Sequence, residues 1–171
     1  MAQERLTVGV VVERRKLSSP WADHIWLPVA VLPDAPDVAP WTPLGEIATA
    51  DRFYVGAFDI DLYRTETANY RDNLASGEPK IWIAARADEG GHPIRIAGIT
   101  ADPAEGEAFT EAGDDTVEAV PMPPEIAARI AAFVAAHHVE RVFFKRKRDR
   151  ADPEALGARV SGPGRAEGEE E

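Results

Sequence analysis

The stretch RFYVGAFDIDLYR, residues 52–64, alternates between apolar and polar side chains more regularly than any other part of the chain. A strand places successive side chains on opposite faces, so this period of two predicts a β-strand with one buried and one wet face. Such half-exposed strands are typical of antiparallel sheets. We expect one face to carry Tyr54, Phe58, Ile60 and Leu62, and the other to carry Asp59, Asp61 and Tyr63.

Shorter segments on both sides of this stretch show the same period. Residues 6–14 and 25–32 are expected to be strands, and Pro28 predicts an edge position or a bulge, because proline cannot donate to a ladder. The inward faces of these two strands are predicted to carry Leu6, Val8, Val10 and Val12, then Ile25, Leu27, Val29 and Val31. Further strands are expected at residues 44–49, 80–86, 94–100 and 116–120, with a hairpin turn at residues 88–92.

A helix is expected after Pro123 and Pro124, since Ile126, Ile130 and Phe133 recur at helical spacing. Six or seven strands followed by this long C-terminal helix predict an α+β domain, built on a mostly antiparallel sheet or a partly open barrel. The predicted core comprises Val8, Val10, Ile25, Val29, Phe58, Ile60, Ile81, Ile83, Ile94 and Ile96, covered by Ile126, Ile130, Phe133 and Val134.

Three regions are predicted along the chain. Residues 1–140 form a single globular domain, residues 141–160 a basic C-terminal extension, and residues 161–171 a disordered acidic tail. The N-terminus runs into the first strand without a signal-peptide pattern, and no window approaches the roughly 20 apolar residues that span a bilayer. We therefore expect a cytoplasmic protein with no membrane insertion.

The composition excludes several functional classes. The 171 residues contain 19 Lys and Arg against 30 Asp and Glu, which gives a net charge of −11. An acidic surface repels the nucleic-acid backbone, so nucleic-acid binding is not expected. The chain has no cysteine. Disulfides, thiol nucleophiles, iron–sulfur clusters and thiolate zinc sites are therefore excluded.

Neither the histidines nor the paired carboxylates form a recognisable catalytic or metal motif. A two-histidine site on a helix needs i, i+4 spacing, whereas His137 and His138 are adjacent. Asp59 and Asp61 share a strand face, which is typical both of a cation site and, more commonly, of a solvated face. Gly90 and Gly91 stand between two strands, where a phosphate-binding loop is not expected. We therefore expect no catalytic residue, no metal site and no cofactor.

Aromatic residues flank a proline-rich segment at residues 33–43, which predicts an extended surface loop. Trp and Tyr dominate the energetics of binding surfaces. The tryptophans Trp21, Trp26 and Trp41 are therefore candidates for a rigid docking surface, with burial at one end of the core as the alternative.

The strongest local contrast to the acidic composition is the segment RVFFKRKRDR, residues 141–150. Two adjacent phenylalanines are usually either buried in the protein or used for binding. A cationic cluster beside them favours an acidic partner. A solvated tail is the alternative interpretation. The predicted partner-binding residues of this segment are Phe143, Phe144, Lys145, Arg146, Lys147, Arg148 and Arg150.

Several motifs together resemble an uncharacterised alphaproteobacterial family, domain-of-unknown-function family 3305. They are GVVVERR at residues 9–15, PWADHIW at 20–26, VAVLP at 29–33, ETANYRDNL at 66–74 and FKRKR at 144–148. The resemblance implies a gene neighbourhood with molybdenum-dependent formate dehydrogenase and its maturation genes. Some members are labelled as molybdopterin-guanine dinucleotide biosynthesis protein A. This chain departs from the guanylyltransferase pattern, because it lacks the N-terminal glycine-rich nucleotide loop.

The resemblance implies a non-catalytic accessory or maturation protein for a molybdenum-dependent oxidoreductase, with formate dehydrogenase as the expected partner. The alternative is a nucleotidyltransferase-like enzyme of molybdenum-cofactor biosynthesis that handles a nucleotide or pterin. That alternative predicts a pocket that collects Arg64, Arg71 and Arg86 near Asp59 or Asp61. The sequence leaves the oligomeric state and the order of the strands open.

Overall fold

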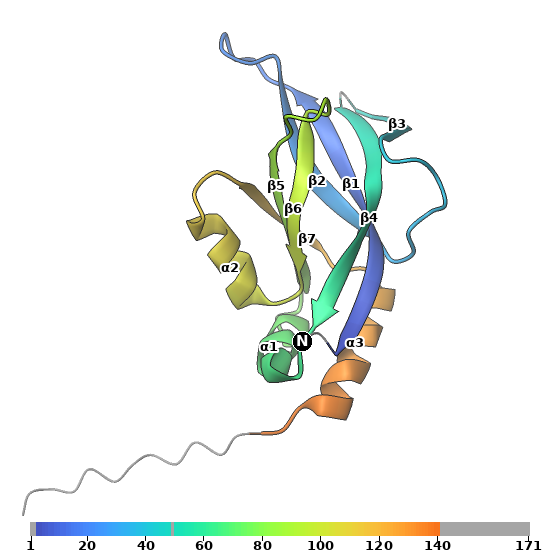
Figure 1. Cartoon of the computed structure of the whole chain (residues 1–171), viewed down its shortest axis with the longest axis vertical. Coiled ribbons are helices and arrows are strands. Elements are labelled where there is room, and N and C mark those ends of the chain that lie inside the picture. The colour runs from blue at the N-terminus through green and yellow to red at the C-terminus, as the bar shows by residue number, and fades with distance from the viewer. Residues whose placement is uncertain (1–2, 49, 141–171) are drawn as a thin grey trace, which may run out of the picture. The chain divides into compact units, whose positions relative to one another are not determined.

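The computed structural model describes residues 3–48 and 50–140. The expected basic extension and acidic tail, residues 141–160 and 161–171, lie outside this part of the chain. The described strands form two antiparallel sheets, one of four strands and one of three (Figure 1). The first sheet has the order β2-β1-β4-β3, and its strands are β1 (Glu4–Lys16), β2 (His24–Leu32), β3 (Thr42–Ile47) and β4 (Ala50–Leu62).

The central strand β1 follows its predicted alternation. Leu6, Val8, Val10 and Val12 are each 0% exposed and face the core. Its neighbour β2 is an edge strand, and its pairing skips Val29 between Ala30 and Pro28. The bulge expected at Pro28 is therefore confirmed, and Pro28 occupies an edge strand as proline chemistry requires.

The bulges overturn two details of the predicted faces. Because paired residues on neighbouring strands share a face, the extra residue Val29 separates Ile25 from Val31, and Ile25 is 37% exposed instead of buried. In β4 the extra residue of a second bulge is Val55, which separates Tyr54 from Phe58, Ile60 and Leu62. Tyr54 pairs with Val11 and therefore lies on the outer face of the sheet. The expectation that Tyr54 shares a face with Phe58, Ile60 and Leu62 is therefore wrong.

Tyr54 is nevertheless buried, because the proline-rich loop packs over the outer face of the sheet. A Cβ atom on Gly9 would lie 2.8 Å from the Tyr54 ring and 3.3 Å from Pro36. Only glycine leaves room for this close packing. Most other residues of the loop are exposed, as expected for a surface segment.

The second sheet has the order β6-β5-β7, with β5 (Lys80–Ala87) between β6 (Ile94–Thr100) and β7 (Thr116–Pro121). Strands β5 and β6 form the predicted hairpin. Ile81 and Ile83 of β5 are both 0% exposed and face the core shared with the first sheet. Strand β2 of the first sheet contacts β7 of the second.

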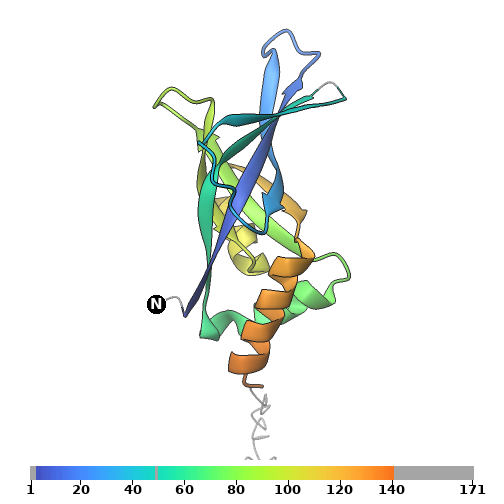
Figure 2. The same ribbon diagram turned by 90° about the vertical axis from the view of Figure 1, so that its right-hand side faces the viewer.

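Three α-helices complete the described part of the chain (Figure 2). A 3₁₀ turn, η1 (Arg64–Glu66), leads into α1 (Thr67–Ala75), which contacts α3 (Pro124–His137). Helix α2 (Pro103–Glu111) packs on the outer face of the second sheet, where a Cβ atom on Gly106 would lie 2.3 Å from Trp82. Asp102 caps α2 by accepting a hydrogen bond from the Ala104 N–H at 2.8 Å.

The α+β class is confirmed, whereas the single sheet or barrel is not. The strands divide into two sheets, and they do not close into a barrel within the described residues. The C-terminal helix α3 has the predicted apolar stripe but is only 14 residues long. Of the predicted core residues, Val8, Val10, Ile60, Ile81, Ile83, Ile126, Ile130 and Phe133 are buried, while Val29, Phe58, Ile94, Ile96 and Val134 are half-buried.

Candidate functional site

An aromatic cluster stands where β2, β4 and the β5–β6 hairpin come together. The Trp26 ring lies 5.7 Å from Trp41 in an edge-on arrangement and 5.4 Å from Phe53. His92, from the β5–β6 hairpin, stacks on the Trp41 ring, with the two ring centres 4.9 Å apart. Centroid distances between 4.5 and 7 Å are favourable for aromatic pairs. The cluster therefore connects the two sheets, and two of the predicted docking tryptophans belong to it.

Trp41 adopts a backbone conformation that a bulky residue rarely takes, with φ at 67°. Its N–H donates a hydrogen bond to the Tyr54 carbonyl at 2.6 Å. Such conformations cost about 1–3 kcal/mol and persist only where the surroundings fix them. The hydrogen bond to β4 and the ring contacts with Trp26, Phe53 and His92 fix Trp41 here.

Charged residues brace the same end of the first sheet. The Arg14 guanidinium lies 5.8 Å from the centre of the Trp26 ring and forms an ion pair with Asp51. On the outer face, Glu13 accepts hydrogen bonds from Arg15 at 2.6 Å and from Arg52 at 3.1 Å. The hydrogen bond from Arg15 is the main reason why the pKa of Glu13 is lowered. Glu13 is therefore held ionised and is not suited to act as a general acid.

Trp21 takes a different position from the other two tryptophans. It lies in the loop between β1 and β2, and 93% of its surface is exposed. Leu17 in the same loop is 40% exposed and Ile25 at the start of β2 is 37% exposed. We call these three residues, together with Ile47, the hairpin patch. Ile47, at the end of β3, is 55% exposed. It lies in the same row across the sheet as Ile25, because Ile47 pairs with Ala50, Ala50 with Arg15, and Arg15 with Ile25.

Asp59 and Asp61 lie on the outer face of β4, as predicted. Arg5 donates a hydrogen bond to Asp61 at 2.8 Å, and Thr7 donates one to Asp59 at 2.6 Å. The Arg5 guanidinium is also 3.7 Å from Asp59. A cation already bridges this carboxylate pair. Among the described residues, no group of three or more metal-ligating side chains is present.

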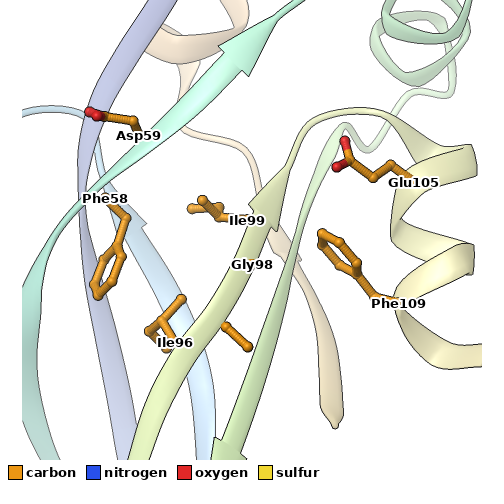
Figure 3. Close-up of a pocket in the computed structure, with 8 residues that line it drawn as sticks. Phe58, Asp59, Ile96, Gly98, Ile99, Glu105 and Phe109 are labelled. Atoms are coloured by element: carbon orange, nitrogen blue, oxygen red, sulfur yellow. The ribbon is translucent and has the colours of Figure 1, made fainter. Parts of the chain in front are cut away.

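Asp59 also lines a pocket of about 360 Å³ between β4, β6 and α2. Figure 3 shows Phe58 and Asp59 on β4, Ile96, Gly98 and Ile99 on β6, and Glu105 and Phe109 on α2. The predicted nucleotide pocket would collect arginines such as Arg64, Arg71 and Arg86 near Asp59 or Asp61. None of these arginines lines either of the two pockets that are described.

The three arginines have other partners instead. Arg64 donates to Gln3 at 3.1 Å, and Arg86 forms two hydrogen bonds with Asp115 at 2.6 and 3.0 Å. The pair with Arg86 lowers the pKa of Asp115. Arg71 lies 3.0 Å from His138 Nε2. The structure therefore does not bring the three guanidinium groups together.

The histidines at the end of α3 have structural contacts. His137 packs on Phe133 with ring centres 4.6 Å apart. His138 Nε2 accepts from Arg71, since a guanidinium can only donate, and Nδ1 lies 3.0 Å from the Thr67 hydroxyl. A neutral His138 ring then carries its proton on Nδ1 and donates to Thr67. These contacts join the end of α3 to the start of α1.

The ETANYRDNL motif at residues 66–74 holds α1 in place through buried polar groups that sequence reasoning did not single out. Asn73 donates to the carbonyls of Lys80 and Ala101 at 2.8 and 2.9 Å, and it accepts from the Lys80 N–H at 3.0 Å. Tyr70 is 2% exposed, and its hydroxyl accepts from the Tyr63 N–H at 3.0 Å. Burial raises the pKa of Tyr70 to about 12. The motif therefore has a structural function here.

The remaining predicted binding residues lie outside the described part of the chain. They are Phe143, Phe144, Lys145, Arg146, Lys147, Arg148 and Arg150.

Two antiparallel sheets on a shared core, with an exposed aromatic hairpin at one end, define a small α+β protein with candidate binding surfaces. The chain belongs to the family described as "Protein of unknown function (DUF3305)", which it matches over residues 7–148. No curated protein and no solved structure matches it. None of the described helices has both the length and the apolar character needed to cross a membrane.

Proposed function

We propose that this protein is a cytoplasmic, non-catalytic accessory protein that docks on another protein through the hairpin patch. The observation that carries the proposal is the 93% exposure of Trp21. A tryptophan loses a large apolar area from water when it binds, and tryptophan is enriched among residues that dominate interface energies. Leu17 in the same loop, Ile25 at the start of β2 and Ile47 at the end of β3 are further exposed apolar side chains at this end of the first sheet.

The base of the hairpin supports this function because it is braced. Trp26 and Trp41 contact each other and Phe53, and Arg14 lies against Trp26 while it pairs with Asp51. A surface that is ordered before binding avoids part of the entropic cost of association. Trp26 and Trp41 would therefore position the patch, while Trp21 would enter the partner.

The proposed partner is a molybdenum-dependent oxidoreductase, with formate dehydrogenase as the first candidate. Support for this partner comes from the gene neighbourhood that the family resemblance implies. We further propose that the basic residues at 145–148 and 150 contact an acidic surface of the same partner. Five cations would accelerate association at low salt.

The genetic test deletes the gene and measures formate dehydrogenase activity in the deletion strain. We expect the activity to fall and to return when the intact gene is supplied. Wild-type activity in the deletion strain would refute the proposed partner. Calorimetric titration of the purified protein with GTP and magnesium addresses the enzymatic alternative, because a docking protein should produce no binding heat.

The surface test compares two exposed apolar residues. Trp21→Ser should abolish co-purification of formate dehydrogenase with the tagged protein. Val38→Ser, which changes a side chain that is 47% exposed in the proline-rich loop, should leave it intact. Both variants should keep the melting temperature of the parent, since neither residue is buried. Equal retention of the enzyme by both variants would show that the hairpin patch is not the docking surface.

A further inference from the structure

Two strand edges face each other across an opening between the sheets. Strand β4 pairs with β1 along its length but with β3 only over Ala50–Tyr54. Strand β6 pairs only with β5 and forms the edge of its sheet. Within the part of the chain that the structure describes, residues 55–62 of β4 and the outer side of β6 therefore have no strand partner. Such edges carry backbone donors and acceptors that can pair with another chain.

The opening between these edges is an apolar groove. The pocket of about 360 Å³ has Phe58 of β4 and Ile96 and Ile99 of β6 in its lining. A second pocket of about 180 Å³ shares Phe58 and Ile96 and reaches Trp41 and His92 of the aromatic cluster, and its lining also contains the oppositely charged Asp88 and Arg95. The groove therefore follows β6 over much of its length.

Carboxylates border the groove on both sides. Asp59 of β4 accepts a hydrogen bond from Thr7, and Glu105 of α2 accepts one from Thr100 at 2.7 Å. Thr7 engages one oxygen of Asp59 and the Arg5 guanidinium lies 3.7 Å from the other, whereas the bond from Thr100 engages only one oxygen of Glu105. The lining of the larger pocket contains these two carboxylates and no cationic side chain. Its charge therefore complements a basic ligand.

Strands β4 and β6 run in the same direction beside the groove (Figure 3). A segment that runs the opposite way would therefore be antiparallel to both. Its side chains would alternate, because successive residues of a strand point to opposite faces. One set would face Phe58, Ile96 and Ile99, and the other would lie near Asp59 and Glu105.

We propose that the groove between β4 and β6 binds an extended segment of a partner protein that carries alternating apolar and basic side chains. The segment pairs with the free edge of β6 as an added strand, a recognised mode of peptide binding. Backbone hydrogen bonds hold the segment, while the apolar floor and the two carboxylates select its sequence. This site shares no residue with the hairpin patch and does not depend on it.

The test measures fluorescence polarisation of a labelled nine-residue peptide in which Lys alternates with Val and Phe, with the full chain as receptor. We expect saturable binding at low salt. A peptide of the same sequence with alternate backbone amides methylated keeps its charge and side chains but loses ladder donors. Its affinity should fall by about tenfold or more. Equal affinity for the two peptides, or no binding of either, would overturn the proposal.

Variants of the receptor locate the site. Asp59→Asn combined with Glu105→Gln should weaken peptide binding by about tenfold at low salt. The matched control, Glu107→Gln with Glu111→Gln, removes the same charge from exposed positions of α2 outside the pocket. It should bind like the parent. Equal weakening by both pairs would show that only the general acidity of the protein attracts the peptide. Circular dichroism checks that both double variants remain folded.

Light scattering and the same peptide assay test for other occupants of the groove and for the independence of the two surfaces. A concentration-dependent dimer in light scattering that disappears in the Asp59→Asn, Glu105→Gln variant would show that a second copy fills the groove. At least tenfold tighter peptide binding after replacement of the five basic residues at 145–148 and 150 by Ser would indicate the chain's own segment. Either result would overturn a partner protein as the occupant. Trp21→Ser should leave peptide binding unchanged, so failure of the proposed docking function is distinguishable from failure of this site.

Discussion

Phe133 provides a direct test of how α3 is packed against the rest of the protein. Its side chain is 2% exposed, and its ring centre lies 6.2 Å from that of Tyr70 in α1. Replacement by alanine removes the ring from a site closed by other buried residues and leaves a cavity. Buried Phe→Ala changes cost about 3–5 kcal/mol. We expect Phe133→Ala to lower the free energy of unfolding by about 4 kcal/mol, because the edge-on contact with Tyr70 is also lost.

Urea unfolding followed by far-UV circular dichroism measures this change. The slope of the free energy of unfolding against urea concentration should stay the same, since the surface exposed on unfolding hardly changes. Phe133→Leu keeps most of the volume and should cost only about 1.5 kcal/mol. The control on the same helix is Arg129→Ala, which removes an exposed ion pair with Glu4 and should cost less than about 1 kcal/mol. A loss below about 1 kcal/mol for Phe133→Ala would refute the packing of α3 against the core.

Three further predictions concern helix packing and pH. Gly106→Ala should destabilise the protein by about 1–3 kcal/mol in the same urea assay, because the new methyl group would overlap Trp82, and a gain in stability would contradict this contact. Tyr70 should titrate near pH 12 in ultraviolet absorbance. Since burial raises its pKa in the folded state, its contribution to stability is present below about pH 10 and is lost as the pH rises towards 12. Glu13 has the opposite sign: Arg15 lowers its pKa, so its contribution is lost as the pH falls through the folded-state pKa. Glu13→Gln should therefore flatten the acid limb of the stability curve, and an unchanged limb would show that the ion pair does not stabilise the fold.

The sequence predicts individual strands well because their periodicity is local. The faces of β1 and the inward residues Phe58, Ile60 and Leu62 of β4 follow directly from alternation. The errors at Ile25 and Tyr54 have a shared cause, since each lies beyond a bulge that adds one residue to its strand. Pro28 signals the first bulge, and the second is signalled by Gly56, which follows Val55 inside the strand and has a φ of 134°. The division into two sheets depends on pairings between distant segments, which alternation does not encode.

The candidate site shows the same limit. The sequence identifies the tryptophans as a group, but it does not separate Trp21 from Trp26 and Trp41. The separation arises because Phe53 of β4 and His92 of the β5–β6 turn pack on two of the three rings. The groove was also beyond prediction, since it exists only because β3 is too short to cover the second half of β4.

The bulges beside β1 have a consequence for how the chain tolerates changes in length. β2 carries Val29 and β4 carries Val55 as extra residues opposite the uninterrupted centre of β1. Deleting Val29 would leave Ala30 opposite Val11 and Pro28 opposite Val12, so both halves of β2 would keep their register. Deleting a paired residue such as Leu27 would instead slide the start of β2 by one position and exchange its inward and outward residues, which would remove Trp26 from the aromatic cluster. Loops such as residues 17–23 and 88–93 carry no such constraint, since they tolerate insertions readily. An alignment of family members should therefore place its gaps in these loops or at the unpaired positions 29 and 55, and keep the spacing of the paired strand residues constant.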